Sequence, residues 1–164
     1  MNRITLIAAI GKNRELGKNN DLIWSIPEDL KFFRENTVGK PIVMGLNTLN
    51  SLPRLLPNRR HIVLSHVKED LDPAITVFYN LDDLLEYILS LDEEVMIIGG
   101  ASIYGQFIDH ADKMLLTEIN EEAMADVYFP EFSYDDWDRE VLSSHIHEDI
   151  EYNHVAYTRK RVKK

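Results

Sequence analysis

The sequence predicts an α/β fold: a mostly parallel central β-sheet, helices on both of its faces and an antiparallel C-terminal edge hairpin. Apolar runs rich in β-branched residues, such as 4–10, alternate with segments of helical spacing, such as 81–89. The final segments, 139–147 and 153–161, alternate apolar and polar residues, which is typical of antiparallel strands with one solvated face. Ligands of parallel sheets bind beyond the carboxyl ends of the strands.

The remaining elements follow in chain order. Strands are expected at 4–10, 41–44, 61–65, 75–78, 94–98 and 113–119, and helices at about 26–36, 46–51, 81–89 and after the glycine pair 99–100. Residues 11–21 (GKNRELGKNND) are polar, and we expect a long loop of the kind that often serves as a lid or binding loop. Ser25 and Glu28 have the spacing of a capping box, and Pro27 suits the first turn of the helix that follows.

Length, charge and composition exclude several classes of protein to which this chain could belong. The 164 residues, 45% of them hydrophobic, predict a single domain over residues 1–164. A net charge of -10 argues against a nucleic-acid partner. The lack of cysteine excludes disulfides and thiolate catalysis and fits a reducing compartment. Residues 4–10 are too short to span a membrane and make a poor signal peptide, so we expect a cytoplasmic protein that does not bind membranes.

The charge is unevenly distributed along the chain. No Asp or Glu occurs between residues 36 and 67, whereas Lys40, Arg54, Arg59 and Arg60 fall in that tract. A basic tract in an acidic protein predicts a small anionic ligand at this place; ordinary fluctuation of charge is the alternative.

Glycines at predicted strand ends favour a phosphate-containing ligand. Gly99 and Gly100 lie between a strand and a helix, where backbone N–H groups can approach an anion. Gly45 with Thr48, and Leu64 with Ser65, occupy two further strand ends. The sequence contains neither a GxGxxG nor a Walker loop. Three strand ends at one edge of the sheet suit a dinucleotide.

Asp29 is the acid that the sequence singles out. It begins a predicted helix and shares a face with Phe32 and Phe33, so the carboxylate either favours the helix dipole or faces a pocket. Glu28 is explained by the capping box. His145 and His147 share a strand face but have no evident third ligand, so no metal site is expected.

Together these pieces resemble the dihydrofolate reductase family (bacterial type) over nearly the whole chain. The resemblance rests on Ala8-Ala9, Gly17, Trp24-x-x-Pro27-x-Asp29-Leu30, Val43-Met44-Gly45 with Thr48 and Ser51, Leu56-Pro57-Asn58-Arg59, Ile97-Ile98-Gly99-Gly100 with Tyr104, Thr117, and Asp126 with Phe129-Pro130. It implies reduction of 7,8-dihydrofolate to tetrahydrofolate by hydride from NADPH, an activity that supplies one-carbon metabolism and thymidylate synthesis. It also implies binding of antifolates such as methotrexate or trimethoprim, and we expect a monomer.

The resemblance assigns roles residue by residue. Asp29 matches the acid that holds the pterin amino group and ring nitrogen, Thr117 the hydroxyl that supports it and Trp24 the indole beside it, with Leu22 near the reacting atoms. Arg59 matches the residue that binds the glutamate carboxylate of the substrate. The other expected substrate contacts are Ile7, Ala8, Leu30, Phe33, Ser51, Leu52, Leu56, Ile98 and Tyr104. The expected cofactor contacts are Ala9, Leu16, Gly17, Asn20, Gly45, Leu46, Asn47, Thr48, Leu64, Ser65, His66, Gly99, Gly100, Ala101, Ser102, Ile103 and Tyr104. The resemblance also implies a cis bond between Gly99 and Gly100.

Four positions depart from the family pattern. Ile23 replaces the usual proline before the tryptophan, and Ala125 the usual glycine before Asp126. Leu46 and Ser102 replace frequent arginines near the adenosine 2′-phosphate and the pyrophosphate. We therefore expect the preference for NADPH over NADH to be reduced.

Two alternatives stay open from the sequence. A reductase of the same fold acting on a pyrimidine intermediate of riboflavin synthesis would share the glycine turn, but it would not need the Trp24 to Asp29 motif. A doubly wound nucleotide-binding or receiver module is the non-enzyme alternative, although receivers need acids at the end of the first strand, where residues 8–11 are Ala-Ala-Ile-Gly.

Overall fold

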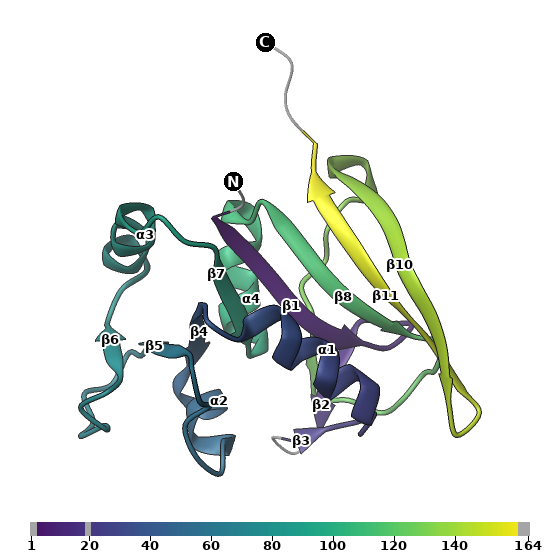
Figure 1. Cartoon of the computed structure of the whole chain (residues 1–164), viewed down its shortest axis with the longest axis horizontal. Helices are drawn as coiled ribbons and strands as arrows, with labels where there is room; N and C mark the ends of the chain where they lie inside the picture. Colours follow the sequence, from purple (N-terminus) through teal and green to yellow (C-terminus); the bar gives the residue numbers. More distant parts are fainter. Residues whose placement is uncertain (1–2, 19–20, 161–164) are drawn as a thin grey trace.

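The architecture is an eight-stranded sheet between two layers of helices, with a three-stranded sheet whose strands β2 and β3 lie below the middle of the large sheet in the view of Figure 1. The structure, a computed structural model, describes residues 3–18 and 21–160. The large sheet has the spatial order β10 (Trp137–His147), β11 (Ile150–Arg159), β8 (Lys113–Ile119), β1 (Ile4–Ile10), β7 (Val95–Gly99), β4 (Pro41–Gly45), β5 (Arg60–Leu64) and β6 (Thr76–Phe78). Pairing is parallel from β8 to β6 and antiparallel for β11 and β10, which confirms the predicted fold class.

The helices cover opposite faces of this sheet. α1 (Pro27–Thr37) and α2 (Leu46–Ser51) pack on one face, and α3 (Leu81–Ser90) and α4 (Ala101–Phe107) on the other, followed by the short 3-10 helices η1 (Ile108–His110) and η2 (Tyr134–Asp136). Side chains of a strand alternate between the faces, so Ile42 and Met44 of β4 face α1 while Val43 faces α4. None of the helices in the described part of the chain is long and apolar enough to cross a membrane.

The segment 11–21 is more regular than predicted. It contains β2 (Glu15–Lys18) and β3 (Asp21–Leu22), and β2 also pairs with β9 (Val127–Tyr128) to form the small sheet. The sequence pattern missed these strands because they are short and polar, and because β9, one of the two partners of β2, lies more than 100 residues away. The expectation of a continuous loop was wrong.

The start of α1 also differs from the prediction. Ile26 is the N-cap residue, and no side chain caps this end of the helix, so the predicted capping box of Ser25 and Glu28 is wrong. The Ile26 carbonyl accepts the N–H groups of Asp29 and Leu30, and the Ile26 side chain is buried beside Tyr152. Burial of Ile26 therefore fixes the start of the helix, with Pro27 in the first turn as predicted.

Candidate functional site

Asp29 reaches across from α1 to the strands of the large sheet. The Thr117 hydroxyl of β8 donates a hydrogen bond to Oδ1 of Asp29, and Nε2 of His154 on β11 lies 3.3 Å from the same oxygen. Among the residues that the structure describes, Asp29 meets these partners through Oδ1 alone, which leaves Oδ2 for a ligand. The Asp29 side chain is only 21% exposed, so this carboxylate is more than a surface acid that favours the helix dipole.

An apolar wall lies on the same face of the sheet. Five of the residues expected to contact substrate pack in or against one cluster: Ile7, Phe33, Leu52, Leu56 and Ile98. Leu30 and Ser51 are exposed, and the Ser51 hydroxyl donates to the Thr48 carbonyl. Asp29 and a half-buried apolar surface thus face one side of the sheet, as a planar, partly polar ligand would require.

Arg59 is held by two hydrogen bonds at the end of this wall. Nε donates to Oγ1 of buried Thr37 at 2.9 Å, and Nη1 donates to the Pro57 carbonyl at 2.8 Å. Burial and the nearby charge of Arg34 lower the pKa of Arg59, although the guanidinium stays charged. Arg34 and Arg59 are thus two neighbouring positive charges, and the guanidinium of Arg59 is fixed in position. This arrangement suits the binding of a carboxylate.

Glycines open the carboxyl edge of the sheet, as predicted. Gly45 of β4 pairs with Leu64 of β5, and Met44 pairs with Gly99 of β7, so these strand ends lie together. The peptide bond between Gly99 and Gly100 is cis, as the resemblance implied. A Cβ on Gly100 would lie 3.7 Å from Oγ1 of Thr48, which leaves a side-chain-free surface between the starts of α2 and α4.

The other residues expected to contact the cofactor, together with Ala8 from the substrate set, fall into three groups. Ala8, Leu16, Leu64, Ile103 and Tyr104 pack in or against the core on the α4 face, so Ala8, expected beside the substrate, lies on the opposite face from most of the wall. The hydroxyl of buried Tyr104 donates to the Ile7 carbonyl at 2.6 Å, and burial raises its pKa. Asn47, His66 and Ser102 are exposed, Leu46 and Ala101 are half-buried, and Ala9 packs with Trp24.

Ser65 is already engaged within its own loop. Its hydroxyl donates to the Val67 carbonyl and accepts the Val67 N–H, at 2.8 and 3.1 Å. A phosphate would therefore have to displace these local bonds. Gly17 pairs with Leu22 in the small sheet, whereas Asn20 lies outside the described residues.

Glu15 is a buried acid that the sequence did not single out. Its Oε1 accepts the Asn13 N–H at 2.6 Å, and its Oε2 accepts the Ala123 N–H at 2.7 Å. Burial alone would raise the pKa of Glu15, but hydrogen bonds from the backbone N–H groups of Ala123, Glu15 itself and Asn13 lower it. The carboxylate thereby joins the 11–18 segment to the loop before β9.

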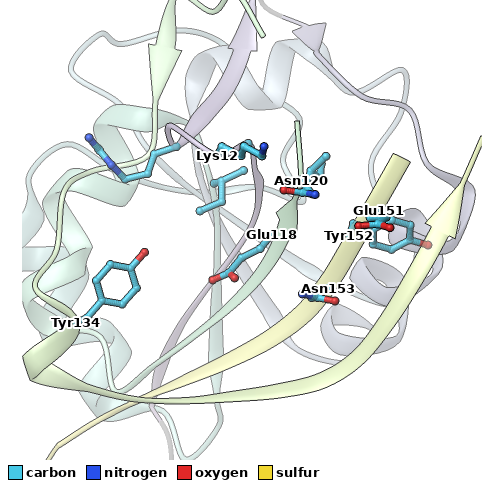
Figure 2. Close-up of a pocket in the computed structure, with 11 residues that line it drawn as sticks. Lys12, Glu118, Asn120, Tyr134, Glu151, Tyr152 and Asn153 are labelled. Atoms are coloured by element: carbon cyan, nitrogen blue, oxygen red, sulfur yellow. The ribbon is translucent and has the colours of Figure 1, made fainter. Parts of the chain in front are cut away.

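A polar hollow of about 300 Å³ lies elsewhere, beside the turn after β1 (Figure 2). Its lining includes Lys12, Arg14, Glu118 and Asn153. Neighbouring residues of a strand point to opposite faces, so Glu118 and Asn153 face away from Thr117 and His154. These two residues thus separate the hollow from the site around Asp29, and Tyr152, which also lines the hollow, lies on the same face as His154.

His154 is the site residue that sequence reasoning missed. A single histidine in an alternating strand carries no signal of its own, and only the pairing of His154 with Thr117 places it beside Asp29. The other histidines of this hairpin do not build a metal site: no group of three His, Asp or Glu residues suited to a metal occurs within 3–18 and 21–160.

Comparisons with known proteins agree with this geometry. Residues 3–164 match the family model described as dihydrofolate reductase. The chain is 40% identical to a dihydrofolate reductase of Bacillus subtilis over 82% of this chain and 79% of the relative, and 37% identical to one of Haemophilus influenzae over 83% and 84%. The solved structure of a dihydrofolate reductase from Enterococcus faecalis, complexed with NADP(H) and RAB-propyl, superposes with a TM-score of 0.88 at 26% identity, covering 96% of each chain.

Proposed function

This chain belongs to the dihydrofolate reductase family, and from that premise we propose that it works through Asp29 as the acid of the substrate pocket. The protein is an NADPH-dependent oxidoreductase that reduces 7,8-dihydrofolate to 5,6,7,8-tetrahydrofolate. The observation that carries the assignment of Asp29 is its carboxylate, held at Oδ1 by Thr117 and open at Oδ2, beside an apolar wall.

The role of Asp29 follows from the chemistry of a pterin ring. Its amino group and neighbouring ring nitrogen offer two parallel donors, and a half-buried carboxylate is a strong bidentate acceptor for them. When NADPH is bound, it supplies the hydride to a ring carbon, and the adjacent ring nitrogen must gain a proton. Asp29 orients the ring and favours arrival of that proton. Thr117 keeps the carboxylate in place, and Trp24 packs over Gly11 at the edge of the site.

The remaining roles extend along the two faces of the sheet. Arg59 binds the glutamate carboxylate of the substrate, with Thr37 and Pro57 holding the guanidinium in position. Gly45, Gly99 and Gly100 let the cofactor come close to the protein backbone at the sheet edge. The Tyr104 ring packs behind Gly99. The residues present fit NADPH, because the glycines at the strand ends leave space that a Cβ would otherwise fill.

The proposal includes the setting and the inhibitors. The protein acts as a single domain, monomeric and cytoplasmic, where NADPH is the reducing cofactor. Methotrexate and trimethoprim carry planar rings with adjacent N–H donors, and they would meet the same Asp29 carboxylate. The family model and the relatives, all described as dihydrofolate reductase, give no support to the alternatives of a pyrimidine reductase and a receiver module.

Two measurements test this function. Loss of NADPH absorbance at 340 nm should depend on added dihydrofolate. Methotrexate titrated into the protein with NADPH present should quench the fluorescence of Trp24 stoichiometrically, and Trp24→Phe should remove most of that response while Trp137→Phe should not. A protein that neither oxidises NADPH with dihydrofolate nor binds methotrexate would contradict the proposal.

A further inference from the structure

His154 and Thr117 form a pair of donors behind the acid of the site. They lie opposite one another on β11 and β8, and both reach Oδ1 of Asp29. His154 is 4% exposed, and Phe32, one turn along α1 from Asp29, stacks on its ring at 3.9 Å with the planes 9° apart. The ring is thus clamped, with Nε2 directed at the carboxylate.

The second nitrogen of this ring begins a chain of polar contacts that runs outward. Nδ1 of His154 lies 3.4 Å from Oγ of Ser143, its partner on β10, and that oxygen lies 2.7 Å from Nε2 of His145. A serine hydroxyl has one hydrogen to donate. If it donates to Nδ1 of His154, the hydroxyl oxygen accepts from His145 and Nε2 of His154 must carry a hydrogen. All donors in the chain then point toward Asp29.

We propose that His154 is a positioning residue that holds the ionised carboxylate of Asp29 by donating a hydrogen bond from Nε2, in a tautomer fixed by Ser143 and His145. The inference rests on the proposed role of Asp29. It adds a second donor to the acid and a path of hydrogen bonds from the edge of the sheet, where His145 is half-buried, to the centre of the site.

The electrostatic setting shows what this donor does. Among the described residues, titratable groups near Asp29 include Glu28 on α1, Tyr152 and His154 on β11, and His145, whose ring lies 5.0 Å from that of His154, on β10. Tyr152 lies close to these charges: burial raises its pKa, and the negative charges of Glu28 and Asp29 raise it further. In this acidic surrounding, each donated hydrogen bond stabilises the ionised form of the Asp29 carboxylate.

The consequence appears in the pH dependence of hydride transfer. The step needs a proton on the substrate ring, so its rate falls as pH rises. Removal of the His154 donor destabilises the ionised carboxylate, and the fall should move to higher pH. A charged hydrogen bond of ordinary strength corresponds to a shift of about one pH unit.

Single-turnover rates as a function of pH test this proposal. His154→Phe preserves a ring for Phe32 to stack on and removes the donor, so its midpoint should rise by about one pH unit. His154→Gln retains an amide donor and should restore most of the wild-type profile. Ser143→Ala should shift the midpoint in the same direction by less. An unchanged midpoint in His154→Phe, or an equal shift in His154→Gln, would overturn the proposal.

A second measurement needs no variant and no turnover. Long-range proton–nitrogen correlations on protein labelled with ¹⁵N-histidine should show a hydrogen on Nε2 of His154; a hydrogen on Nδ1 alone would overturn the proposal.

The rates of Asp29→Asn separate the role of His154 from the proposed role of Asp29. If that variant keeps wild-type activity, the assignment of Asp29 fails. If it loses activity while His154→Phe shows no shift, only the role of His154 fails.

Discussion

The substitution Glu15→Gln tests how the 11–18 segment is held to the loop before β9. The Glu15 carboxylate accepts a backbone N–H on each oxygen, from Asn13 and from Ala123. Glutamine keeps one acceptor but turns an NH₂ group toward the other N–H, so one hydrogen bond to a charged group is lost and two partly buried donors meet. Such a bond contributes about 1.5–3 kcal/mol, and we expect the free energy of unfolding to fall by roughly 2–3 kcal/mol.

Thermal and urea unfolding, followed by circular dichroism, measure this loss. For a chain of this length, about 2–4 °C of Tm accompanies each kcal/mol, so Tm should fall by roughly 5–10 °C. Glu131→Gln makes the same chemical change at a surface partner of Arg14 whose side chain is 87% exposed, and it should stay within about 0.5 kcal/mol of wild type. Equal stability of the two variants would refute the reasoning.

The difference in unfolding free energy between wild type and Glu15→Gln should depend on pH, which gives an independent check. Hydrogen bonding lowers the pKa of Glu15 in the folded protein, whereas the unfolded chain has a value near 4.5. The stabilisation is therefore fully present above about pH 4.5 and is lost as pH falls through the folded pKa. The gap between wild type and Glu15→Gln should be constant from pH 6 to 8 and narrow in acid. A gap that widens in acid would contradict the assignment.

Three further predictions address the ligand contacts and the glycines. Arg59→Lys should raise the KM for dihydrofolate by about tenfold with little change in kcat, because lysine cannot make two parallel hydrogen bonds to a carboxylate. In steady-state kinetics with a folate analogue that lacks the glutamate, the variant and the wild type should have the same KM. Leu46→Arg should raise the ratio of kcat/KM for NADPH over NADH by about tenfold, whereas an already strong preference that the variant leaves unchanged would contradict the expected weak discrimination. Gly99→Ala should lower the free energy of unfolding, measured by urea titration, by about 2 kcal/mol or more, because the φ of Gly99 is 118° and the added Cβ would lie 3.2 Å from the Tyr104 ring. The control is Gly105→Ala in α4, where the added Cβ has open space around it, and this variant should be as stable as wild type or more stable.

The sequence allowed the parallel layers to be predicted because their signals are local. An apolar run such as Ile4–Ile10 must be buried on both faces, and the leucines of Leu81–Ser90 recur at helical spacing. The strand Glu15–Lys18 gave no such signal, since it is stabilised by pairing with Val127–Tyr128 far along the chain. The predicted cap at Ser25 failed because burial of Ile26, a tertiary effect, decides where the helix begins.

The site divides in the same way. Local patterns drew attention to Asp29, to the basic tract that contains Arg59, and to Gly99 between a strand and a helix, whereas the roles of Asp29 and Arg59 came from the resemblance to the family. His154 could not be found, because its role depends on the register between β11 and β8. Glu15 looked like a loop acid, since only the fold brings the Ala123 N–H to its carboxylate. Pairing across distant strands is the information that local patterns lack.

The single-turnover rate of hydride transfer by Asp29→Asn, measured across pH, is the sharpest test of Asp29 as the acid of the substrate pocket. A positioned acid contributes about 10²–10⁴-fold, so the variant should lose at least 100-fold at pH 7. It should regain part of that loss at low pH, where the substrate arrives already protonated, and its fold should match wild type by circular dichroism. A rate and pH profile equal to those of the wild type would contradict the account.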